Sequence, residues 1–381
     1  MLPQRDVKEM LIPRQGKIRR TYRDTEMNIE QTHIIIPIGN KAVGNGKPCF
    51  IIAEAGVNHN GDLSLARKLI DVAYESGADA IKFQTFKTSH LVTCNAEKAE
   101  YQKKNDSLNP TQFGMLEKLE LSDNDFKKLS TYARKKGILF LSTAFDEESV
   151  DLLIRLDVPA FKIPSGEITN FPCLEKIARQ KKPVILSTGM STLEEVREAV
   201  TCLQEHGCRD IILLHCTTSY PAPLESVNLQ VMDTLRDVFH LPVGYSDHTE
   251  GILVPVAAVA RGACVIEKHI TLDRTLSGPD HAASIEPNEL KRMIDTVRKV
   301  EQALGTADKK PESCEIGNRN VVRKSVVASE HIRKGSLLQE SMLALKRPGT
   351  GIEPKYMKDL VGKRVKTAIE KDTLITQDMI E

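Results

Sequence analysis

Two histidines in this sequence have the residue type and the spacing of metal ligands. His248 lies in GYSDHT and His269 lies in VIEKHIT, each at the end of a short run rich in apolar residues. One stretch of helical character separates the two runs. If the runs are neighbouring parallel strands, both imidazoles arrive at the same edge of one sheet. Such a pair suits a divalent transition metal with open positions, which can polarise a carbonyl as a Lewis acid.

The ends of the other expected strands also carry ionisable or hydroxyl residues. In chain order these are Glu54, Lys82, Ser142, Thr143, Lys162, Ser165, Glu167, Ser187, His215, Thr217, Thr218, Ser246 and Glu267. A single histidine after a strand is more often a packing residue than a ligand. A sheet that needed only stability would not place ionisable groups at nearly every strand end, so the pattern indicates a functional site.

These residues fall into two further chemical groups. Cations and hydroxyl donors suit a ligand that carries phosphate and carboxylate, and they are Lys82, Lys162, Ser165, Ser187, Thr218 and Ser246. Carboxyl groups that can orient water or move protons are Glu54, Glu167 and, further along the chain, Asp280. The alternative chemistry is a Schiff-base aldolase with Lys82 or Lys162 as its nucleophile. That alternative leaves the two histidines and the serines without a role.

The elements that would position these groups alternate between strand and helix over residues 49–305. CFIIAEAG opens the series and VIEKHIT closes it, and each of the eight apolar runs is followed by an amphipathic stretch. This number and order predict a (β/α)8 TIM barrel, in which catalytic groups lie at the C-terminal ends of the strands. A doubly wound open sheet is the alternative, because βαβ repetition alone does not show closure.

Two connections are longer than packing requires, and loops of that length are usually functional or disordered. The first covers residues 88–112 and carries Tyr101, Lys103 and Lys104 without clear periodicity. The second covers residues 272–287 and holds SGPDHAAS. Both would lie on the same face of the barrel as the polar strand ends.

Composition excludes several classes of protein. The chain has 381 residues, 40% hydrophobic and 28% charged, with a net charge of +1, so no global field attracts nucleic acid or an anionic membrane. No apolar run approaches the roughly 20 residues of a membrane span, and the N-terminus lacks the apolar centre of a signal peptide. The eight cysteines are scattered without a CxxC motif, which is typical of reduced thiols. We expect a cytoplasmic protein.

The chain divides into four expected parts. Residues 1–32 form a polar N-terminal extension, in which Met27 is an alternative start. Residues 33–307 form the barrel domain, preceded by a hairpin of HIIIPIG and KAVG that plugs the barrel entrance. Residues 308–324 are a polar linker, and residues 325–381 form a small domain in which VVASEHIRKGSLL loosely resembles VKTAIEKDTLI. So small a domain would be marginal alone, and docking onto a barrel or a partner subunit would help it.

Eight motifs in order resemble the sialic acid synthase family, which joins phosphoenolpyruvate to an N-acetylated mannosamine-type sugar. They are IIAEAGVNHNG, AIKFQTF, FKIPSGEITN, ILSTGM, HCTTSYP, GYSDHT, VIEKHIT and GPDHAASIEP. The resemblance runs from about His33 to the C-terminus. The last domain is similar to the antifreeze-like (SAF, β-clip) domain that these enzymes carry.

The resemblance implies a role for each candidate residue. His248 and His269 would bind Mn²⁺, with Mg²⁺ and Co²⁺ as alternatives, to hold the aldehyde of the open-chain sugar. Phosphoenolpyruvate would be held by Lys82, Lys162, Ser165, Ser187 and Ser246. Glu167 and Asp280 would handle the water that attacks C2, Glu54 would contact the aldehyde end of the sugar, and Tyr220 would line the N-acetyl pocket. Thr218 departs from the asparagine of some members, which affects only the fine affinity for phosphate.

The resemblance also implies a domain-swapped homodimer, in which Arg347 of LKRPGTG reaches from the small domain into the partner's barrel. The product would be N-acetylneuraminate or N,N'-diacetyllegionaminate, with phosphate released. FQTF and IPSGEITN favour the legionaminic branch, which uses 2,4-diacetamido-2,4,6-trideoxymannose, over the branch that uses N-acetylmannosamine. An N-acetylmannosamine 6-phosphate acceptor is disfavoured, because no further basic cluster accompanies the two lysines. A barrel that binds sugar acids without turnover is the alternative from another class of protein.

Overall fold

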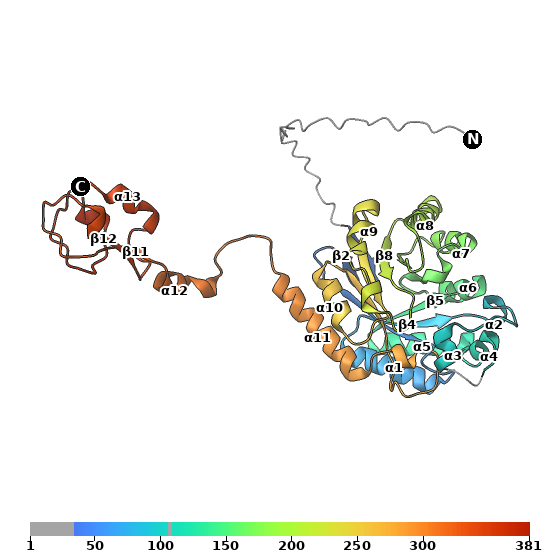
Figure 1. Ribbon diagram of the computed structural model, residues 1–381. Helices are drawn as coiled ribbons and strands as arrows, with labels where there is room; N and C mark the ends of the chain where they lie inside the picture. The colour runs from blue at the N-terminus through green and yellow to red at the C-terminus, as the bar shows by residue number, and fades with distance from the viewer. Residues whose placement is uncertain (1–33, 106–108) are drawn as a thin grey trace, which may run out of the picture. The chain divides into compact units, whose positions relative to one another are not determined.

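The computed structural model describes residues 34–105 and 109–381, which form two units. The first unit ends at Leu304, and the second comprises Gly305–Glu381 (Figure 1). The expected N-terminal extension, with Met27, lies outside the described residues. The polar strand ends singled out above belong to the first unit, whereas Arg347 belongs to the second.

Eight parallel strands form a closed barrel in the first unit. In chain order they are β3 (Phe50–Gly56), β4 (Ala80–Thr85), β5 (Leu139–Ala144), β6 (Phe161–Ile163), β7 (Val184–Ser187), β8 (Ile211–Cys216), β9 (Val243–Asp247) and β10 (Val265–His269). Strand β10 pairs with both β9 and β3, which closes the ring. The strands are nearly continuous apolar runs because side chains cover one face and helices the other. Closure confirms the predicted (β/α)8 barrel and excludes the open sheet.

Helices pack around the outside of the barrel (Figure 1). They are α1 (Leu63–Ser76), α5 (Asp123–Lys136), α6 (Glu147–Arg155), α7 (Phe171–Ala178), α8 (Leu193–Glu205), α9 (Val231–Phe239), α10 (Leu253–Ala260) and α11 (Pro287–Leu304). Local chemistry sets their ends: Thr192 and Glu195 form a capping box that starts α8, and Gly77 ends α1 with a left-handed φ of 87°. Among the residues that the structure describes, no helix is long and apolar enough to cross a membrane.

An N-terminal hairpin fills the end of the barrel opposite the polar strand ends. Strand β1 (Ile35–Ile38) pairs antiparallel with β2 (Lys41–Gly44). Ile36, Ile38 and Val43 are buried in one cluster with inward-facing residues near the start of the barrel strands, such as Phe50. This end of the barrel is therefore packed with apolar side chains, and the polar groups gather at the other end.

Short helices follow several strands at the polar end. Between β4 and α5 lie α2 (Thr88–Leu91), α3 (Glu100–Asn105) and α4 (Gln112–Glu117), while η1 (Ser165–Glu167), η2 (Leu224–Ser226) and η3 (His281–Ala283) follow β6, β8 and β10. The sequence showed no periodicity over residues 88–112. Helices of four to six residues are too short to display the 3.6-residue pattern, which explains why they were not predicted.

The second unit has its own small core. Its elements are α12 (Ser313–Val322), β11 (Ser325–Ala328), η4 (Glu340–Met342), β12 (Leu343–Lys346), η5 (Pro354–Tyr356), α13 (Met357–Leu360) and η6 (Gln377–Met379). The stretch expected to be a linker thus contains α12. The two similar segments noted in the sequence lie side by side, because Val327 bridges Leu374 and Ile332 bridges Ile369. Apolar residues of both segments contribute to the core of this unit.

Candidate active site

The residues predicted from the sequence converge on one cavity at the C-terminal ends of the barrel strands. Its volume is about 270 Å³, and the predicted residues that line it are Glu54, Lys82, Lys162, Ser165, Ser187, Thr218, Tyr220, Ser246, His248, His269 and Asp280. Glu167 is not among the lining residues; in η1 it accepts a hydrogen bond of 2.6 Å from Asn170 Nδ2. Arg347 follows β12 in the second unit, so the first unit does not contain it.

Two buried lysines and two buried glutamates, here called the charged floor, are Glu54, Lys82, Lys162 and Glu267. Lys82 Nζ lies 2.6 Å from Glu54 Oε2 and 3.7 Å from Glu267 Oε2. Lys162 Nζ lies 3.7 Å from Glu267 Oε1 and donates to Ser187 Oγ at 2.6 Å. Strand register produces this arrangement, since Glu54 of β3 is the direct partner of Lys82 on β4. The floor therefore joins strands from opposite ends of the barrel sequence.

Burial and mutual charge set the protonation of the charged floor. Burial lowers the pKa of Lys82, but Glu267 and Glu54 outweigh it and the pKa is raised. Burial, helped by the charge of Lys82, lowers the pKa of Lys162. Burial raises the pKa of Glu54 to about 7, even though Lys82 opposes it. Burial raises the pKa of Glu267, but Lys162 and Lys82 outweigh it, so the pKa lies below its usual value. Glu54 therefore titrates near neutral pH while Glu267 stays ionised.

A turn after β7 brings a backbone N–H beside two hydroxyl groups. Gly189 N donates to Ser165 Oγ at 2.9 Å. A Cβ at Gly189 would lie 2.4 Å from Thr218 Oγ1 and 2.8 Å from Ser165 Oγ, so only glycine fits there. Together with the Lys162–Ser187 pair, this donor cradle of Ser165, Ser187 and Thr218 suits an anion such as phosphate.

The two histidines lie beside one another where β9 and β10 end, with ring centroids 5.5 Å apart. His248 Nδ1 lies 2.8 Å from Thr217 O. A carbonyl oxygen can only accept, so Nδ1 carries a proton, and Nε2 is the nitrogen that can bind a metal ion once it is deprotonated. His269 Nδ1 is buried and has no hydrogen-bond partner among the described residues. The pair therefore offers free nitrogen atoms at the cavity.

The histidine pair fits a divalent metal ion. Burial and the charge of His248 hold the pKa of His269 well below its usual value, so this imidazole is neutral, as a metal ligand must be. Burial lowers the pKa of His248, but the neighbouring Cys216 outweighs it and the pKa is raised. Metal binding at His248 would therefore release a proton. Its Nδ1 contact with Thr217 is the type of contact that orients metal-bound imidazoles.

An aromatic stack that lines the cavity begins at His248. Tyr220 lies over His248 with ring centroids 4.1 Å apart, and Tyr101 of α3 stacks on Tyr220 at 4.8 Å. Asp280 lines the same part of the cavity, where burial raises its pKa to about 6 while His248 opposes the shift. Asn105 Nδ2 donates to Pro279 O at 2.7 Å, which joins α3 to the loop that carries Asp280.

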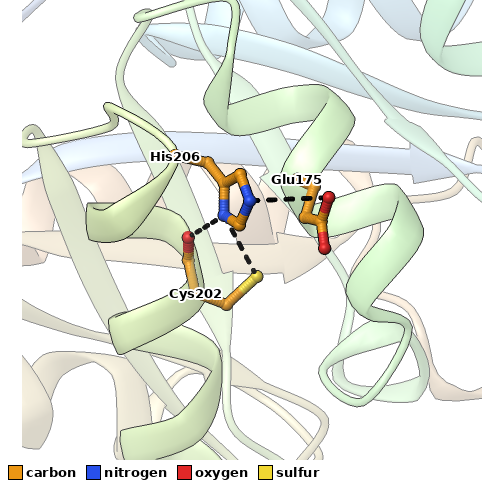
Figure 2. A group of neighbouring side chains, drawn as sticks. All are labelled: Glu175, Cys202 and His206. Carbon is orange, nitrogen blue, oxygen red and sulfur yellow. Dashed lines mark hydrogen bonds and ion pairs between the residues drawn. The ribbon is translucent and has the colours of Figure 1, made fainter.

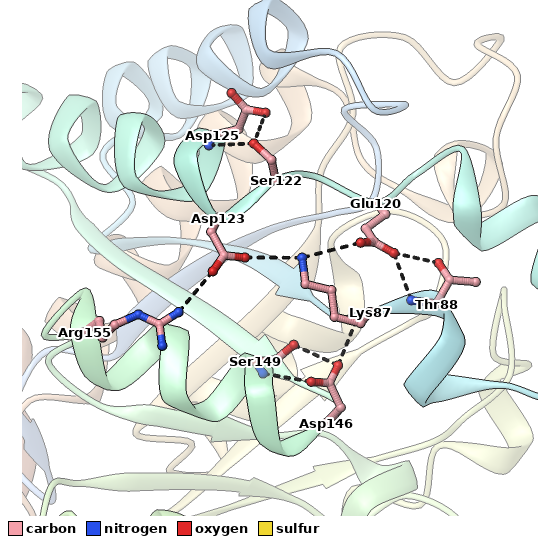
Figure 3. Close-up of polar contacts among 9 residues, drawn as sticks. All are labelled: Lys87, Thr88, Glu120, Ser122, Asp123, Asp125, Asp146, Ser149 and Arg155. Atoms are coloured by element: carbon pink, nitrogen blue, oxygen red, sulfur yellow. Dashed lines mark hydrogen bonds and ion pairs between the residues drawn. The ribbon is translucent and has the colours of Figure 1, made fainter.

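The opposite side of the cavity is apolar. This wall, here called the apolar wall, consists of Phe86, Leu91, Val92, Met115, Leu116 and Phe145. Polar contacts hold the start of α2, which carries part of this wall (Figure 3). Lys87 N donates to Asp146 at 2.8 Å, and Lys87 Nζ lies 3.2 Å from Asp123 and 3.5 Å from Glu120. Thr88 N also donates to Glu120, at 2.9 Å. The wall is thus tied to the starts of α5 and α6.

Glu267 and Tyr101 belong to the site but received no role from the sequence. Glu267 lies two residues before His269 on β10, so strand alternation places both side chains on the inner face. That signal was present, and Glu267 proves to face both lysines of the floor. Tyr101 lies in a long connection without periodicity. The sequence placed this segment on the face of the barrel that carries the cavity, but no local pattern indicates which of its side chains contacts the site, so the stack on Tyr220 was not predicted.

A second group of potential metal ligands lies between α7 and α8, away from the cavity lining (Figure 2). Donor atoms of Glu175, Cys202 and His206 lie within 4.8 Å of one another. His206 Nδ1 donates to Cys202 O at 2.8 Å, and its Nε2 lies 3.5 Å from Glu175 Oε2. Arg179 also pairs with Glu175, at 3.0 Å. These contacts join α7 to α8, so the group has a structural role without a metal ion.

Comparison with known proteins agrees with this geometry. Residues 69–309 match the NeuB family, and residues 323–381 match the SAF domain. The chain is 50% identical to the N,N'-diacetyllegionaminic acid synthase of Legionella pneumophila over 90% of its own length and 98% of the relative's. It is 40% identical to the N-acetylneuraminate-9-phosphate synthase of Homo sapiens, with 89% and 94% covered.

A solved structure extends the similarity to three dimensions. The crystal structure of N-acetylneuraminic acid (sialic acid) synthetase from Leptospira borgpetersenii, in complex with citrate, matches with a TM-score of 0.67 at 36% identity. The match covers 76% of this chain and 98% of that one. The barrel, the second unit and the sequence similarity all lead to the same assignment: this chain belongs to the NeuB family.

Proposed function

We propose that this protein is a nonulosonic acid synthase, a transferase that condenses phosphoenolpyruvate with an open-chain N-acetylated amino sugar. The observation that carries the proposal is the union of charged floor, donor cradle and histidine pair in one cavity. C3 of phosphoenolpyruvate forms the new carbon–carbon bond with the aldehyde carbon, and the aldehyde oxygen takes up a proton. Water then adds to C2. Phosphate leaves when the bond between C2 and the bridging phosphate oxygen breaks. The product is a 2-keto sugar acid.

The floor lysines and the donor cradle hold phosphoenolpyruvate in this proposal. Lys82 keeps its charge, because two carboxylates raise its pKa, and it can bind the substrate carboxylate. The remaining anionic oxygens are surrounded by residues of β6, η1, β7 and β9, namely Lys162, Ser165, Ser187 and Ser246. Thr218 supplies a hydroxyl that can donate to phosphate. A ligand of high negative charge matches the donors that converge here.

His248 and His269 hold a divalent metal ion, for which we propose Mn²⁺, with Mg²⁺ and Co²⁺ as alternatives. Bound there, the ion supplies a Lewis acid for the aldehyde oxygen of the sugar. Tyr220 packs against the face of His248 and excludes water from that side. Tyr220 also lines the space that the N-acetyl group of the sugar would enter.

Three carboxyl groups move or hold protons. Glu54 has a pKa of about 7 and lies against Lys82, so it can take up or release a proton at the aldehyde end of the sugar. Asp280 has a pKa of about 6 and can accept a proton from the water that adds to C2. Burial raises the pKa of Glu167, against its bond to Asn170. Glu167 would have to leave Asn170 to assist the same water.

The apolar wall supports 2,4-diacetamido-2,4,6-trideoxymannose as the acceptor, which would make the product N,N'-diacetyllegionaminate. A methyl group at C6 gains about 0.8 kcal/mol when it enters an apolar site, whereas a hydroxyl or phosphate there would lose hydration. Among the described lining residues the cations are Lys82 and Lys162, which already serve the other substrate. The legionaminic relative is also the more similar one, at 50% identity against 40% for the human 9-phosphate synthase. N-acetylmannosamine is the second candidate.

A homodimer would complete the site. Large apolar residues are exposed in the segments that follow β7, β8, β9 and β10 at the mouth of the barrel, among them Met190, Leu224, Leu253 and Leu276. An apolar rim of this kind is typical of a docking surface. We propose that the second unit of another copy covers it and brings Arg347 toward the sugar. Arg347→Ala would then raise the KM of the sugar, and unchanged turnover and sugar affinity would contradict the proposal.

The cytoplasm is the compartment that fits this chemistry. All eight cysteines are free, and Cys216 lies against the proposed metal ligand His248. Thiols persist in a reducing compartment. The proposed substrates and the reduced thiols therefore suit a cytoplasmic enzyme, which cell fractionation would test.

Phosphate release from phosphoenolpyruvate tests the proposal. The protein is incubated with Mn²⁺ and a panel of amino sugars, with and without chelator, and products are identified by mass. We expect release with the trideoxy sugar, its loss on chelation and its recovery with added Mn²⁺. No release with any sugar would favour a barrel that only binds sugar acids. The lowered pKa of Lys162 also fits a Schiff-base aldolase; activity that survives chelation, with a borohydride-trapped lysine adduct, would favour that reaction.

A further inference from the structure

A buried ion pair that the proposed reaction does not use lies directly behind the two histidines. Asp247 precedes His248 and Lys268 precedes His269, and the two charged residues are register partners on β9 and β10. Side chains alternate along a strand, so these two point away from the cavity, into the layer between barrel and helices. Both side chains are fully buried, with 0% exposed.

Thr249 completes the arrangement. Lys268 Nζ lies 2.5 Å from Asp247 Oδ2 and also donates to Thr249 O. Thr249 donates back to Asp247 Oδ1, through its hydroxyl at 2.9 Å and its backbone N at 3.1 Å. We call Asp247, Thr249 and Lys268 the buried clamp. It holds the residues on both sides of His248, using the lysine that immediately precedes His269.

Stability alone does not account for the buried clamp. Two charges that leave water lose their hydration, and a well-packed apolar pair of similar size is often as stable or more stable. The distinct property of an ion pair is that it specifies one arrangement. If β9 slid past β10, Lys268 would lose Asp247 and both charges would be buried without a partner. The clamp therefore fixes how the ends of the two strands lie relative to one another.

We propose that the buried clamp positions His248 and His269 and thereby sets the affinity of this pair for a divalent metal ion. The inference rests on the metal role that the proposed function gives to the two histidines. Metal ligands must be held within about 0.5 Å of their productive geometry. The His248 side chain is held by the bond from Nδ1 to Thr217 O, and its backbone is held by the clamp residues before and after it. The clamp residues act through the histidines, as positioning residues.

Titration of the metal-free, full-length protein with Mn²⁺ tests this inference, with free Mn²⁺ measured by electron paramagnetic resonance. The variant Asp247→Asn/Lys268→Met removes both charges together, so neither is left unpaired. We expect its Kd for Mn²⁺ to rise about tenfold, at the lower end of the effect of residues that support metal ligands. The melting temperature of the metal-free protein should change by only a few degrees. Thr249→Val, which keeps the ion pair, should raise the Kd by a smaller factor.

A partly exposed ion pair at the other end of the barrel provides the control. Arg298 Nη2 lies 3.2 Å from Asp79 Oδ2, and Asp79→Asn/Arg298→Met should leave the Kd unchanged. An equal rise in this control would mean general loosening and would overturn the inference. Wild-type affinity in both clamp variants would also overturn it. If the double clamp variant does not fold, the Kd of Thr249→Val for Mn²⁺ alone tests the inference.

A further variant separates the inference from the proposed function. His269→Ala defines the Mn²⁺ binding that occurs outside the histidine pair. If the wild-type protein binds no more tightly than His269→Ala, the metal role of the pair is wrong and the clamp inference falls with it. If the wild type binds tightly and the clamp variants match it, only the clamp inference fails.

Discussion

The charged floor and the apolar wall of the cavity are built in different ways. The floor comes from side chains of in-register barrel strands, and its charges are paired at distances such as the 2.6 Å between Lys82 and Glu54. Half of the wall residues come from α2 and α4, short helices in the connection between β4 and α5, and the others lie in the segments next to α2, β4 and β5. Strand geometry can hold a reaction centre rigidly, whereas an inserted connection can vary without disturbing the barrel. We infer that the floor serves the reaction and the wall selects the acceptor.

Removal of Lys162 should have the largest effect, because it takes away a cation of the floor. Lys162→Met should lower kcat/KM for phosphoenolpyruvate about 10³-fold, which corresponds to about 4 kcal/mol of transition-state binding. Glu267 remains paired with Lys82, so the protein should still fold. Steady-state phosphate release and the melting temperature measure the two effects.

The control for this variant is Lys176→Met, because Lys176 pairs with Asp151 on the outer helices. It should keep wild-type kinetics. A loss of less than tenfold in Lys162→Met would show that the floor is not where phosphoenolpyruvate reacts.

Asp280 should give the activity its dependence on acidic pH. Its pKa is raised to about 6, so lowering the pH through 6 protonates the carboxylate and removes it as a proton acceptor. We expect kcat/KM to fall below pH 6 in the wild type. Asp280→Asn should lower kcat/KM about 10²-fold at pH 8 and abolish this acidic limb.

Asp273→Asn is the matched control, since Asp273 lies in the same loop and accepts hydrogen bonds from Thr275. It should retain the wild-type pH profile. An unchanged acidic limb in Asp280→Asn would assign that limb to another group.

Local sequence patterns predicted the strand-end residues of the site, whereas contacts between distant segments were not predicted. Lys82 and Lys162 were predictable because each lies in a short apolar strand whose end is visible in the sequence. The pairing of Glu267 with both lysines was not, because it joins side chains of β10, β4 and β6 across the barrel interior, and these strands are not neighbours in the sheet. Glu167 was placed at the cavity, yet the turn of η1 directs it to Asn170 instead. Tyr101 depends on a tertiary contact that no local pattern encodes.

Tyr101 should affect the sugar and not phosphoenolpyruvate. Its stack on Tyr220 is of a kind that contributes about 0.5–1.5 kcal/mol, so Tyr101→Ala should raise the KM of the sugar about two- to tenfold. The KM of phosphoenolpyruvate should stay within twofold. Tyr74→Ala removes an exposed tyrosine of α1 and should change neither constant. Equal changes in both constants for Tyr101→Ala would contradict a role of the aromatic stack in sugar binding alone.

The smallest effect is expected at Lys87, which anchors the wall without lining the cavity. Partly exposed ion pairs contribute about 0.2–1 kcal/mol, so Lys87→Met should raise the KM of the sugar only about twofold. Its backbone bond to Asp146 remains, and the wall should loosen without collapsing. Hydrogen exchange should become faster in α2 and α4 but not in β4. Faster exchange in β4 as well would mean that the wall and the floor loosen together. It would contradict the proposal that the two are built and act separately.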